Sequence, residues 1–387
     1  MRDVSERFYV DWDTIGVILG NASAIDMPRL SVRDSAQANE FLASYGFDAD
    51  DPAQFKELEK LKQDAVRFID QHLVQDPDYP RLRLEMPDLV RHEDDARNLL
   101  LMASQNGSPE GRWACAVLRI MHTLTHVHND LSMNFFPAIQ KQVLDRVLAY
   151  VHTDPSGDVY LGGENGVRLY MLDIKTQKSY DSLVLKLLHK PENVGADIFD
   201  RIGFRFVTFT KLEALLVLRF LRHSVFAFPN VKAARSRNTL IHIGRFHAEL
   251  DKLKPLLLHG ELSEAELLKR VNDIAESESC RPVVEREKLR DRNVYSSTEY
   301  TSIQFTCRQL IRVKGPPIAA PGQTPKEGQV EYKFFFPYEV QILDKASYIE
   351  SRRGRSSYSE YKRAQLRAAR ERVFPWLVEE EFESQTS

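Results

Sequence analysis

The sequence predicts an α+β protein in which a mainly helical N-terminal part precedes a mixed β-sheet flanked by helices. Two observations predict this division. Up to residue 150, apolar side chains recur at three- and four-residue steps, as on the buried face of an amphipathic helix. After residue 150, four segments with alternating or β-branched and aromatic composition appear between further helical patterns, at about 168–174, 202–209, 300–313 and 330–343.

Composition sets the broad class. The chain has 387 residues, of which 43% are hydrophobic and 28% charged, as in an ordinary folded protein. Its net charge of −3 gives no global attraction to nucleic acid or to an anionic membrane, so any such surface must be local. No segment approaches the roughly 18 apolar residues of a membrane span, and the first residues hold no apolar signal core. We therefore expect a cytoplasmic protein with no membrane partner.

The cysteines agree with that location. They number three and are scattered along the chain, at Cys115, Cys280 and Cys307. This is too few for a disulfide framework and lacks the paired spacing of a zinc site. We expect free thiols in a reducing compartment.

The N-terminal part is predicted to be a series of helices. Residues 1–32 contain a short apolar patch, TIGVILG, to which the sequence assigns no role. Helical periodicity then predicts five helices, at 35–45, 52–73, 94–104, 111–131 and 134–151. A proline-rich connection, DPDYPRLRLEMPD, lies between the second and third, and its LRLEM is expected to be extended. The run His92 to Asp95 is expected to cap the helix that follows it.

The second part begins with a stretch rich in Gly, Asp and Ser, VHTDPSGDVYLGGENG, which marks a loop or hairpin. A strand is predicted at 167–174, then a lysine-bearing helix, then a strand at 202–209 and a helix at 211–227. Residues 228–294 are expected to be an insertion that carries two helices, 246–258 and 262–277.

Two more strands are predicted after this insertion, at 299–313 and 330–343, with a Pro/Gly-rich loop between them. Pro337 requires a bulge, an edge or a break in the last strand. An arginine-rich helix with a glycine interruption follows at 346–374. We therefore predict a helical domain at 1–150, a sheet domain at 151–375 and an acidic tail at 376–387.

A group of histidines has two interpretations. His122 and His126 share a helix face at i, i+4, with His128 and Asp130 nearby, which is a spacing that metal ligands use. No HExxH motif or matching cysteine accompanies them. Core or interface histidines are the favoured interpretation.

The stretch from Ile174 to Thr210 contains residue types that a phosphoryl-transfer site needs. Lysines and serines in a helical frame are followed by Asp200 at the mouth of a strand. Lysine suits phosphate oxygens, and a carboxylate at a strand mouth suits Mg²⁺. A solvated helix followed by a core strand explains this stretch equally well. The sequence contains no Walker A, GxGxxG or GxSxG motif.

Two later strands add polar side chains to one face each. Glu339 and Gln341 alternate with Val340 and Ile342, and burying a carboxylate in so apolar a strand is costly without a cation or a donor. In the preceding strand, the side chains that alternate to one side are Tyr300, Ser302 and Gln304. Two acids on neighbouring strands would hold a metal ion and leave one able to accept a proton.

The order of these segments resembles the synthetase domain of the RelA/SpoT family, which transfers pyrophosphate from ATP to the ribose 3′-hydroxyl of GDP or GTP. The family has a lysine-containing SIxxK helix, a DxxGxR strand, a GYxSLH strand, an ExQIR strand and a helix with a YK pair. The corresponding segments here are KSYDSLVLK (178–186), DRIGFR (200–205), EYTSIQ (299–304), EVQIL (339–343) and YSEYK (358–362). The resemblance covers roughly residues 170–365.

The resemblance implies a nucleotidyltransferase-like fold and a set of roles. Asp200 and Glu339 would be the catalytic and Mg²⁺-binding acids, with Glu339 assisting the metal or activating the acceptor hydroxyl. Tyr300 would stack on the base of the guanine nucleotide acceptor. ATP and acceptor would be held further by Lys178, Ser182, Lys186, Arg205, Ser302, Gln304 and Gln341. Positioning and charge neutralisation dominate such transfers.

Several departures from the family pattern leave other functions open. The family's histidine is Gln304 here and an arginine is Leu343, while Thr176 replaces an arginine ahead of the first lysine. About 95 residues separate Gly203 from Tyr300, more than the family usually has. Nothing in the N-terminal half resembles the family's hydrolase domain, so no alarmone hydrolysis is expected.

Two alternatives follow from these departures. One changes the acceptor to the 3′ end of an RNA such as tRNA, bound by Lys232, Arg235, Arg237 and Arg245 and by the arginine-rich final helix. The charged residues of that surface are also explained as an ordinary solvated face. The other alternative is a catalytically inactive nucleotide-binding or scaffold protein.

Overall fold

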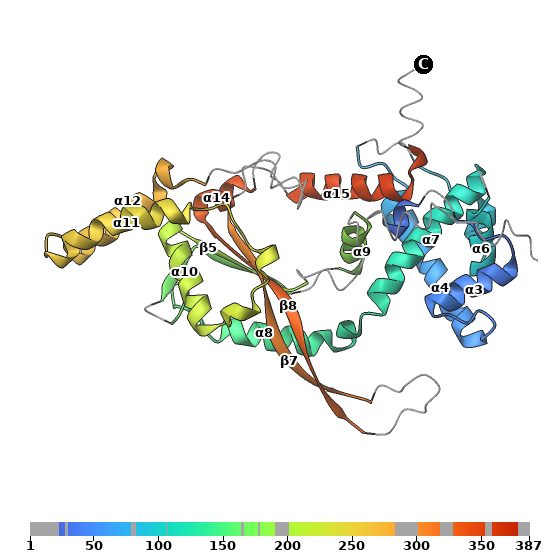
Figure 1. The fold of residues 1–387 in the computed structure, drawn as a ribbon, viewed down its shortest axis with the longest axis horizontal. Helices are drawn as coiled ribbons and strands as arrows, with labels where there is room; N and C mark the ends of the chain where they lie inside the picture. The colour runs from blue at the N-terminus through green and yellow to red at the C-terminus, as the bar shows by residue number, and fades with distance from the viewer. Residues whose placement is uncertain are drawn as a thin grey trace, which may run out of the picture. The chain divides into compact units, whose positions relative to one another are not determined.

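The structure, a computed structural model, describes most of the chain. The described ranges are 23–27, 30–78, 83–105, 107–163, 166–176, 179–189, 201–282, 301–317, 328–352 and 358–377. The chain divides into two compact units (Figure 1). Unit 1 comprises Met1–Asp130, Ser179–Ile198 and Lys362–Ser387, and unit 2 comprises Leu131–Lys178 and Phe199–Tyr361.

Unit 1 is helical in its described part. Its helices are α3 (Ser35–Tyr45), α4 (Pro52–Phe68) with a π-helical turn (Ile69–Leu73), α5 (Asp88–His92), α6 (Ala96–Ala103), α7 (Pro109–His128), α9 (Tyr180–Leu188) and most of α15 (Tyr358–Val373), with a short 3₁₀ turn at Ala24–Asp26. Side-chain caps define where they begin: Asp34 precedes α3, Asp51 precedes α4 and Ser108 precedes α7. The predicted cap at the His92–Asp95 run is confirmed, since the Asp95 carboxylate accepts the Arg97 amide at 2.9 Å.

One core holds unit 1 together, and α7 runs through it with more than half of its residues buried. Helix α9 contributes its apolar face to the same core, through Leu183, Val184, Leu187 and Leu188. At the end of the chain, Phe374 packs within 5.2 Å of the Trp113 ring. Helix α9 and the C-terminal part of α15 therefore belong with the N-terminal helices, although they are far from them in sequence.

Unit 2 is built on a five-stranded sheet in the order β4-β5-β8-β7-β6. The strands are β4 (Met171–Lys175), β5 (Gly203–Thr208), β8 (Val330–Asp344), β7 (Ile303–Gly315) and β6 (Arg237–Asn238). Strands β5 and β8 are parallel, and the other neighbours are antiparallel. A small antiparallel sheet, β1 (Val151–Thr153), β2 (Val159–Leu161) and β3 (Val167–Leu169), precedes it.

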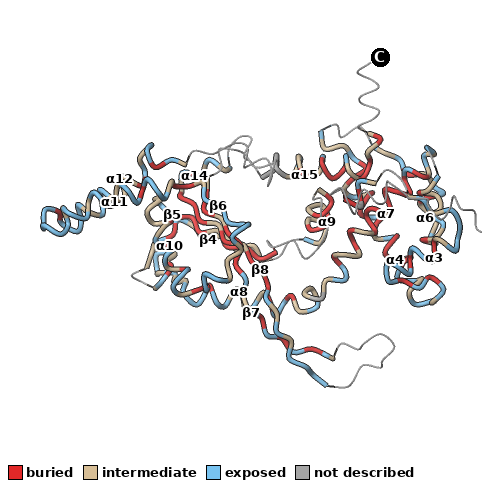
Figure 2. The backbone as a smooth tube through the Cα atoms, viewed as in Figure 1, coloured by how far each residue is buried: buried red, intermediate tan, exposed pale blue. Residues whose placement is uncertain are grey.

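Helices cover one face of this sheet. Helix α8 (Phe136–Leu148) and helix α10 (Lys211–Ser224) share a core with the inward side chains of β5, β7 and β8. Figure 2 shows the buried residues concentrated along these strands. Unit 2 also contains α11 (Ile243–Leu258), α12 (Glu264–Glu276), α14 (Lys345–Glu350) and short 3₁₀ turns at Leu131–Phe135, Phe228–Asn230, Ala233–Arg235 and Glu278–Cys280.

The sheet explains how Pro337 fits inside β8. The Glu339 amide donates to the Ile202 carbonyl on the β5 side at 2.9 Å, so the nitrogen of Pro337, two residues earlier, points to the same side. The pairing of β5 with β8 begins only at Glu339. Pro337 therefore presents its missing N–H to an unpaired edge, which is one of the three solutions that the sequence required.

The mixed α+β class is confirmed, and most predicted elements lie within a few residues of the observed ones. The segment 167–174 differs, because it forms two strands: 167–169 pair with β2, whereas 171–175 pair with β5. The glycine-rich stretch before it is a hairpin, in which Asp154 and Asp158 bracket the turn. No helix in the described part of the chain is long and apolar enough to cross a membrane.

Candidate functional site

A row of polar side chains crosses the face of the sheet opposite the helix-covered core. Cross-strand register aligns five of them, one from each strand: Asp173, Arg205, Gln341, Gln304 and Arg237. Since directly paired residues point to the same face of a sheet, all five lie on one side. Their neighbours along the strands, such as Phe204, Val340 and Phe305, point into the core. We call these five residues, together with Glu339, the polar row.

Hydrogen bonds connect one half of the polar row. The Arg205 Nε atom donates to Oε1 of Gln341 at 3.0 Å, and an Arg205 terminal nitrogen lies 3.4 Å from Oδ2 of Asp173. The Gln341 amide in turn donates to Oε2 of Glu339 at 3.1 Å. The guanidinium thus bridges three strands, and its side chain is 23% exposed.

The other half of the row approaches Glu339 from β7. The Gln304 amide donates to Oε1 of Glu339, and a terminal nitrogen of Arg237 donates to Oε1 of Gln304 at 2.9 Å. Each carboxylate oxygen of Glu339 therefore accepts one amide hydrogen. A carboxylate has about four lone-pair sites, so both oxygens keep acceptor capacity.

Gly203 leaves a gap beside Glu339. It pairs with Lys175 on one side and with Glu339 on the other, and has no side chain to fill the face between them. A Cβ built on Gly203 would lie 3.9 Å from the Cβ of Lys175 and 3.9 Å from the Cβ of Glu339, which are ordinary contacts. The gap is therefore a consequence of the residue chosen and is not imposed by the backbone.

The polar row suits an anionic ligand. Two guanidinium groups, Arg205 and Arg237, lie on either side of the centre. Within the row, Arg205 pairs with the carboxylate of Asp173, and Arg237 donates to the neutral amide of Gln304. Planar guanidinium groups recognise phosphate and carboxylate by paired hydrogen bonds. The arrangement offers two such donors and one acceptor carboxylate on a single half-buried face.

The described residues do not by themselves make the predicted Mg²⁺ site. Within the described ranges no group of three or more His, Cys, Asp or Glu residues could hold a metal ion. Glu339 is flanked by amide donors, and the other acid of the row, Asp173, faces Arg205. The second predicted ligand, Asp200, lies outside the described residues.

The predicted site residues other than Ser302 fall into three groups. Lys178 and Tyr300 lie, like Asp200, outside the described residues. Ser182 and Lys186 lie on α9, in unit 1. Arg205, Gln304, Glu339 and Gln341 come together in the polar row of unit 2.

Ser182 lies close to Lys362, which belongs to another segment matched by the resemblance. Its hydroxyl accepts a hydrogen bond from Ser179, the residue that caps α9, at 2.8 Å. The Lys362 ammonium, from the segment YSEYK, lies 3.5 Å from the same oxygen. The lysine helix and the final helix of the resemblance thus touch within unit 1.

Ser302 is held in the interior by contacts with Thr239. It is fully buried, its backbone amide donates to Thr239 Oγ1 at 3.0 Å, and its carbonyl accepts from the Thr239 amide at 2.9 Å. Its hydroxyl has no hydrogen-bond partner among the described residues.

Sequence reasoning missed Asp173 and assigned Arg237 to a different surface. The signal for Asp173 was an isolated acid inside the apolar segment VRLYMLDI. Arg237, which the sequence grouped with Lys232, Arg235 and Arg245 as a candidate for RNA binding, bonds Gln304 in the polar row. Arg245 donates to the carbonyl of Ser279, in the 3₁₀ turn Glu278–Cys280, at 3.1 Å.

The Lys232 backbone continues this edge of the sheet. Its amide donates to the Thr306 carbonyl of β7 at 2.9 Å, and the neighbouring Val231 bridges to Cys307. Arg235 lies in the 3₁₀ turn that leads to β6. Lys232 therefore borders the polar row, of which Arg237 is a member.

The histidines of α7 pack against aromatic rings in unit 1. The His122 ring contacts the Tyr45 hydroxyl and lies 4.7 Å from the His126 ring. Burial, reinforced by His126, lowers the pKa of His122 to about 4. His128 stacks on Tyr180 of α9 and bonds its hydroxyl, so this histidine joins α7 to α9.

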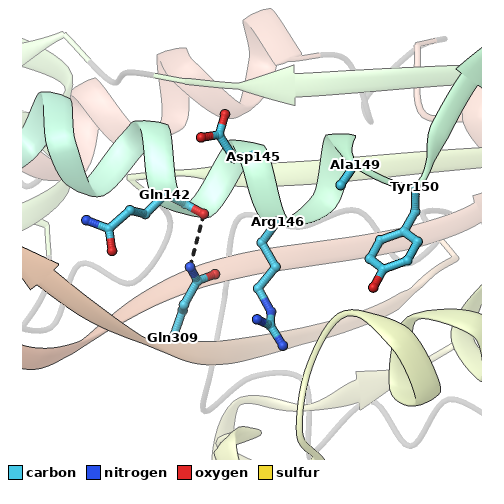
Figure 3. A pocket seen from close by; sticks show the side chains of 6 residues that line it. All are labelled: Gln142, Asp145, Arg146, Ala149, Tyr150 and Gln309. Atoms are coloured by element: carbon cyan, nitrogen blue, oxygen red, sulfur yellow. Dashed lines mark hydrogen bonds between the residues drawn. The ribbon is translucent and has the colours of Figure 1, made fainter.

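A hollow in unit 2 lies on the opposite side of the sheet from the polar row. It is lined by Gln142, Asp145, Arg146, Ala149, Tyr150 and Gln309, and Figure 3 shows the Gln309 amide donating to the Gln142 carbonyl, at 3.0 Å. The Gln142 side chain also bonds both backbone groups of Arg312. The two glutamines bond each other and the β7 backbone, so this part of the hollow is a junction between α8 and β7.

Compared with protein-family models and with curated proteins, the sequence matches none of them.

Proposed function

We propose that the polar row binds the phosphates of a nucleotide, and that the chain is a pyrophosphokinase with a nucleotidyltransferase-like fold. One observation carries the proposal: Glu339 lies at the centre of a hydrogen-bonded face with a guanidinium group on each side and the Gly203 gap beside it. The resemblance to the RelA/SpoT family supports it, because four of the residues that the resemblance selected lie together in this row.

The chemistry of the proposal assigns a role to each group. The ribose 3′-hydroxyl of GDP or GTP attacks the β-phosphorus of ATP, a new P–O bond forms, and the bond from that phosphorus to the oxygen bridging to the α-phosphate breaks, releasing AMP. Glu339 accepts the hydroxyl proton through a free lone pair. Arg205 and Arg237 neutralise charge on the phosphoryl oxygens as it redistributes.

The resemblance assigns roles to further residues. Lys178 would bind ATP phosphates and Tyr300 would stack on the acceptor base, whereas Ser182 and Lys186 belong to unit 1 and are not part of the site proposed on the polar row. Asp200 would join Glu339 as the Mg²⁺ ligand, and Mg²⁺ would neutralise phosphate charge when bound. Among the described residues no group of three or more His, Cys, Asp or Glu side chains could hold the ion, and the roles given to Glu339, Arg205 and Arg237 do not require it.

The test is transfer of label from ATP carrying ³²P in its γ-phosphate to GDP or GTP in the presence of Mg²⁺. We expect a labelled nucleoside 3′-diphosphate with the native protein and a loss of at least about 100-fold with Glu339→Gln, since general bases contribute about 10²–10⁴-fold. Glu264→Gln, an exposed acid at the start of α12, is the matched control and should retain activity. Absence of transfer to both acceptors, or full activity of Glu339→Gln, refutes the proposal.

A second candidate, a nucleotide-binding protein without turnover, is favoured by one observation. Both oxygens of Glu339 already accept amide hydrogens, from Gln304 and Gln341. Such bonds use part of the acceptor capacity of the carboxylate, which leaves less of it for a substrate hydroxyl. Equilibrium dialysis with ATP, run beside the transfer assay, distinguishes the two: binding without label transfer selects this candidate.

A further inference from the structure

Strands β7 and β8 continue beyond the rest of the sheet as a two-stranded ribbon. Strand β5 pairs only with the last six residues of β8, and β6 pairs only with the first two of β7. From Arg308 to Gly315, β7 pairs with β8 alone (Figure 1). Over the seven steps from Arg308 to Gly315, at about 3.4 Å per residue, this ribbon is about 24 Å long.

One face of the ribbon is anchored to α8. Ile311, Val313 and Phe336 are buried in the same core as Ile139 and Val143 of α8. The Gln142 side chain adds hydrogen bonds to the Arg312 backbone, at 2.8 and 3.2 Å. The ribbon is therefore a fixed part of unit 2, and its other face has a defined orientation.

That other face is exposed, basic and interrupted by an apolar pair. Figure 2 shows exposed residues alternating with buried ones along the ribbon. The ribbon face consists of Arg308, Leu310, Arg312 and Lys314 from β7 with Lys333 and Phe335 from β8. By the alternation of the strands, it is the same side of the sheet as the polar row.

The order of side chains on the ribbon face is regular. Leu310 and Phe335 lie directly opposite each other and are 42% and 53% exposed. Arg308 precedes this pair and lies 5.8 Å from the centroid of the Phe335 ring. The next register pair on this face is Arg312 with Lys333. Cations therefore flank an exposed ring on both sides.

A single acid shares this face, and its environment is strongly cationic. Glu331 pairs with Lys333 at 2.9 Å. Lys333 first, and then Arg312 and Lys314, hold the pKa of Glu331 below its usual value. The ribbon face thus carries an excess of positive charge on a chain whose net charge is −3.

We infer that the ribbon face binds single-stranded nucleic acid, with phosphates on Arg308, Arg312 and Lys333 and a base stacked on Phe335. Sequence-tolerant binding of single strands combines a cationic track with aromatic rings on which bases stack. A duplex offers no unstacked base to the ring. The inference does not depend on the proposed function, and it uses a different surface from the basic residues selected in the sequence.

The test is fluorescence anisotropy with a labelled oligouridine, without ATP, so that failure here and failure of pyrophosphate transfer are observed separately. We expect binding that weakens with salt. Arg312→Ala with Lys333→Ala should lower the salt slope by about 1.4, at about 0.7 per phosphate contact. Lys252→Ala with Lys254→Ala, two exposed lysines of α11, removes the same charge and should leave binding unchanged.

The inferred stacking of a base on Phe335 is tested separately. Phe335→Leu should weaken binding by about 5- to 150-fold, the value of one stacked base, with the salt slope unchanged. Phe335→Tyr should restore it. All these side chains are exposed, and unfolding temperatures check that the variants fold.

Several results would overturn the inference. One is that the protein does not bind oligouridine at low salt. Another is that the α11 double variant weakens binding as much as Arg312→Ala with Lys333→Ala. The third is that Phe335→Leu binds oligouridine as tightly as the native protein. Tighter binding of duplex RNA, of an acidic peptide or of anionic vesicles than of oligouridine would assign the face to a different partner. The corresponding oligothymidine distinguishes RNA from DNA within the inferred class.

Discussion

Replacing Gly203 by alanine should stabilise unit 2 while weakening its proposed ligand binding. The added methyl group would meet the Glu339 carbonyl oxygen at 3.8 Å and the Lys175 and Glu339 Cβ atoms at 3.9 Å, so nothing has to move. At a compatible backbone position, Gly→Ala stabilises by about 0.4–1 kcal/mol because it restricts the unfolded chain. For a unit of this size, that corresponds to a rise in Tm of about 1–4 °C.

Ligand binding should change in the opposite direction. The methyl group would occupy the gap between Lys175 and Glu339, where we propose that a phosphate approaches. Crowding a well-fitted contact costs about 1–3 kcal/mol, or about 5- to 150-fold in affinity for ATP. Gly203→Leu, which fills more of the gap, should bind ATP more weakly still.

The assay is thermal unfolding with isothermal titration of ATP. Gly244→Ala on α11 is the control, since its Cβ also meets only ordinary contacts, the nearest at 3.5 Å from His242 Cε1. It should raise Tm and leave ATP binding unchanged. The reasoning is wrong if Gly203→Ala binds ATP as tightly as the native protein, or if it lowers Tm.

Two further predictions concern unit 1. Arg119→Met should lower the free energy of unfolding of unit 1, measured in urea, by at least about 2 kcal/mol, because the buried guanidinium donates to the carbonyls of Val373 and Met27 at 2.8 and 2.6 Å. The control is Arg112→Met, at an exposed position on the same helix. Equal losses in the two variants would contradict the argument. His122 has a pKa of about 4 in the folded state against 6.5 unfolded, so the unfolded state takes up its proton first. Neutral His122 therefore contributes to the free energy of unfolding. That contribution is complete above about pH 6.5 and is lost as the pH falls towards 4, by about 3 kcal/mol in all. Urea titrations of native protein and His122→Gln should diverge over that range, and parallel pH profiles would show that His122 is not the cause.

Local pattern predicted many of the elements in both halves of the chain. The helix at 35–45 and the strands at 202–209 and 330–343 agree with α3, β5 and β8 to within about a residue. Periodicity and capping act within a few residues, so the sequence states them directly. The same reasoning placed Glu339 and Gln341 on one face of a strand, and the hydrogen bond between them confirms it.

Pairing between distant segments could not be predicted in the same way. Strand β8 lies between β5 and β7, so that Arg205 meets Gln341 and Gln341 aligns with Gln304. The first of these pairs depends on register between residues more than a hundred positions apart in the sequence. The division of 167–174 into two strands has the same origin, because its halves pair with different sheets.

The sequence by itself determined which residues alternate on each strand and where helices begin and end. The tertiary structure alone decided that Asp173 and Arg237 join the polar row, that α9 packs in unit 1, and that the exposed ends of β7 and β8 form one basic face. The physical reason is that side-chain alternation is a local property of the chain. Which strand lies beside which is decided by the burial of the whole core, to which every segment contributes.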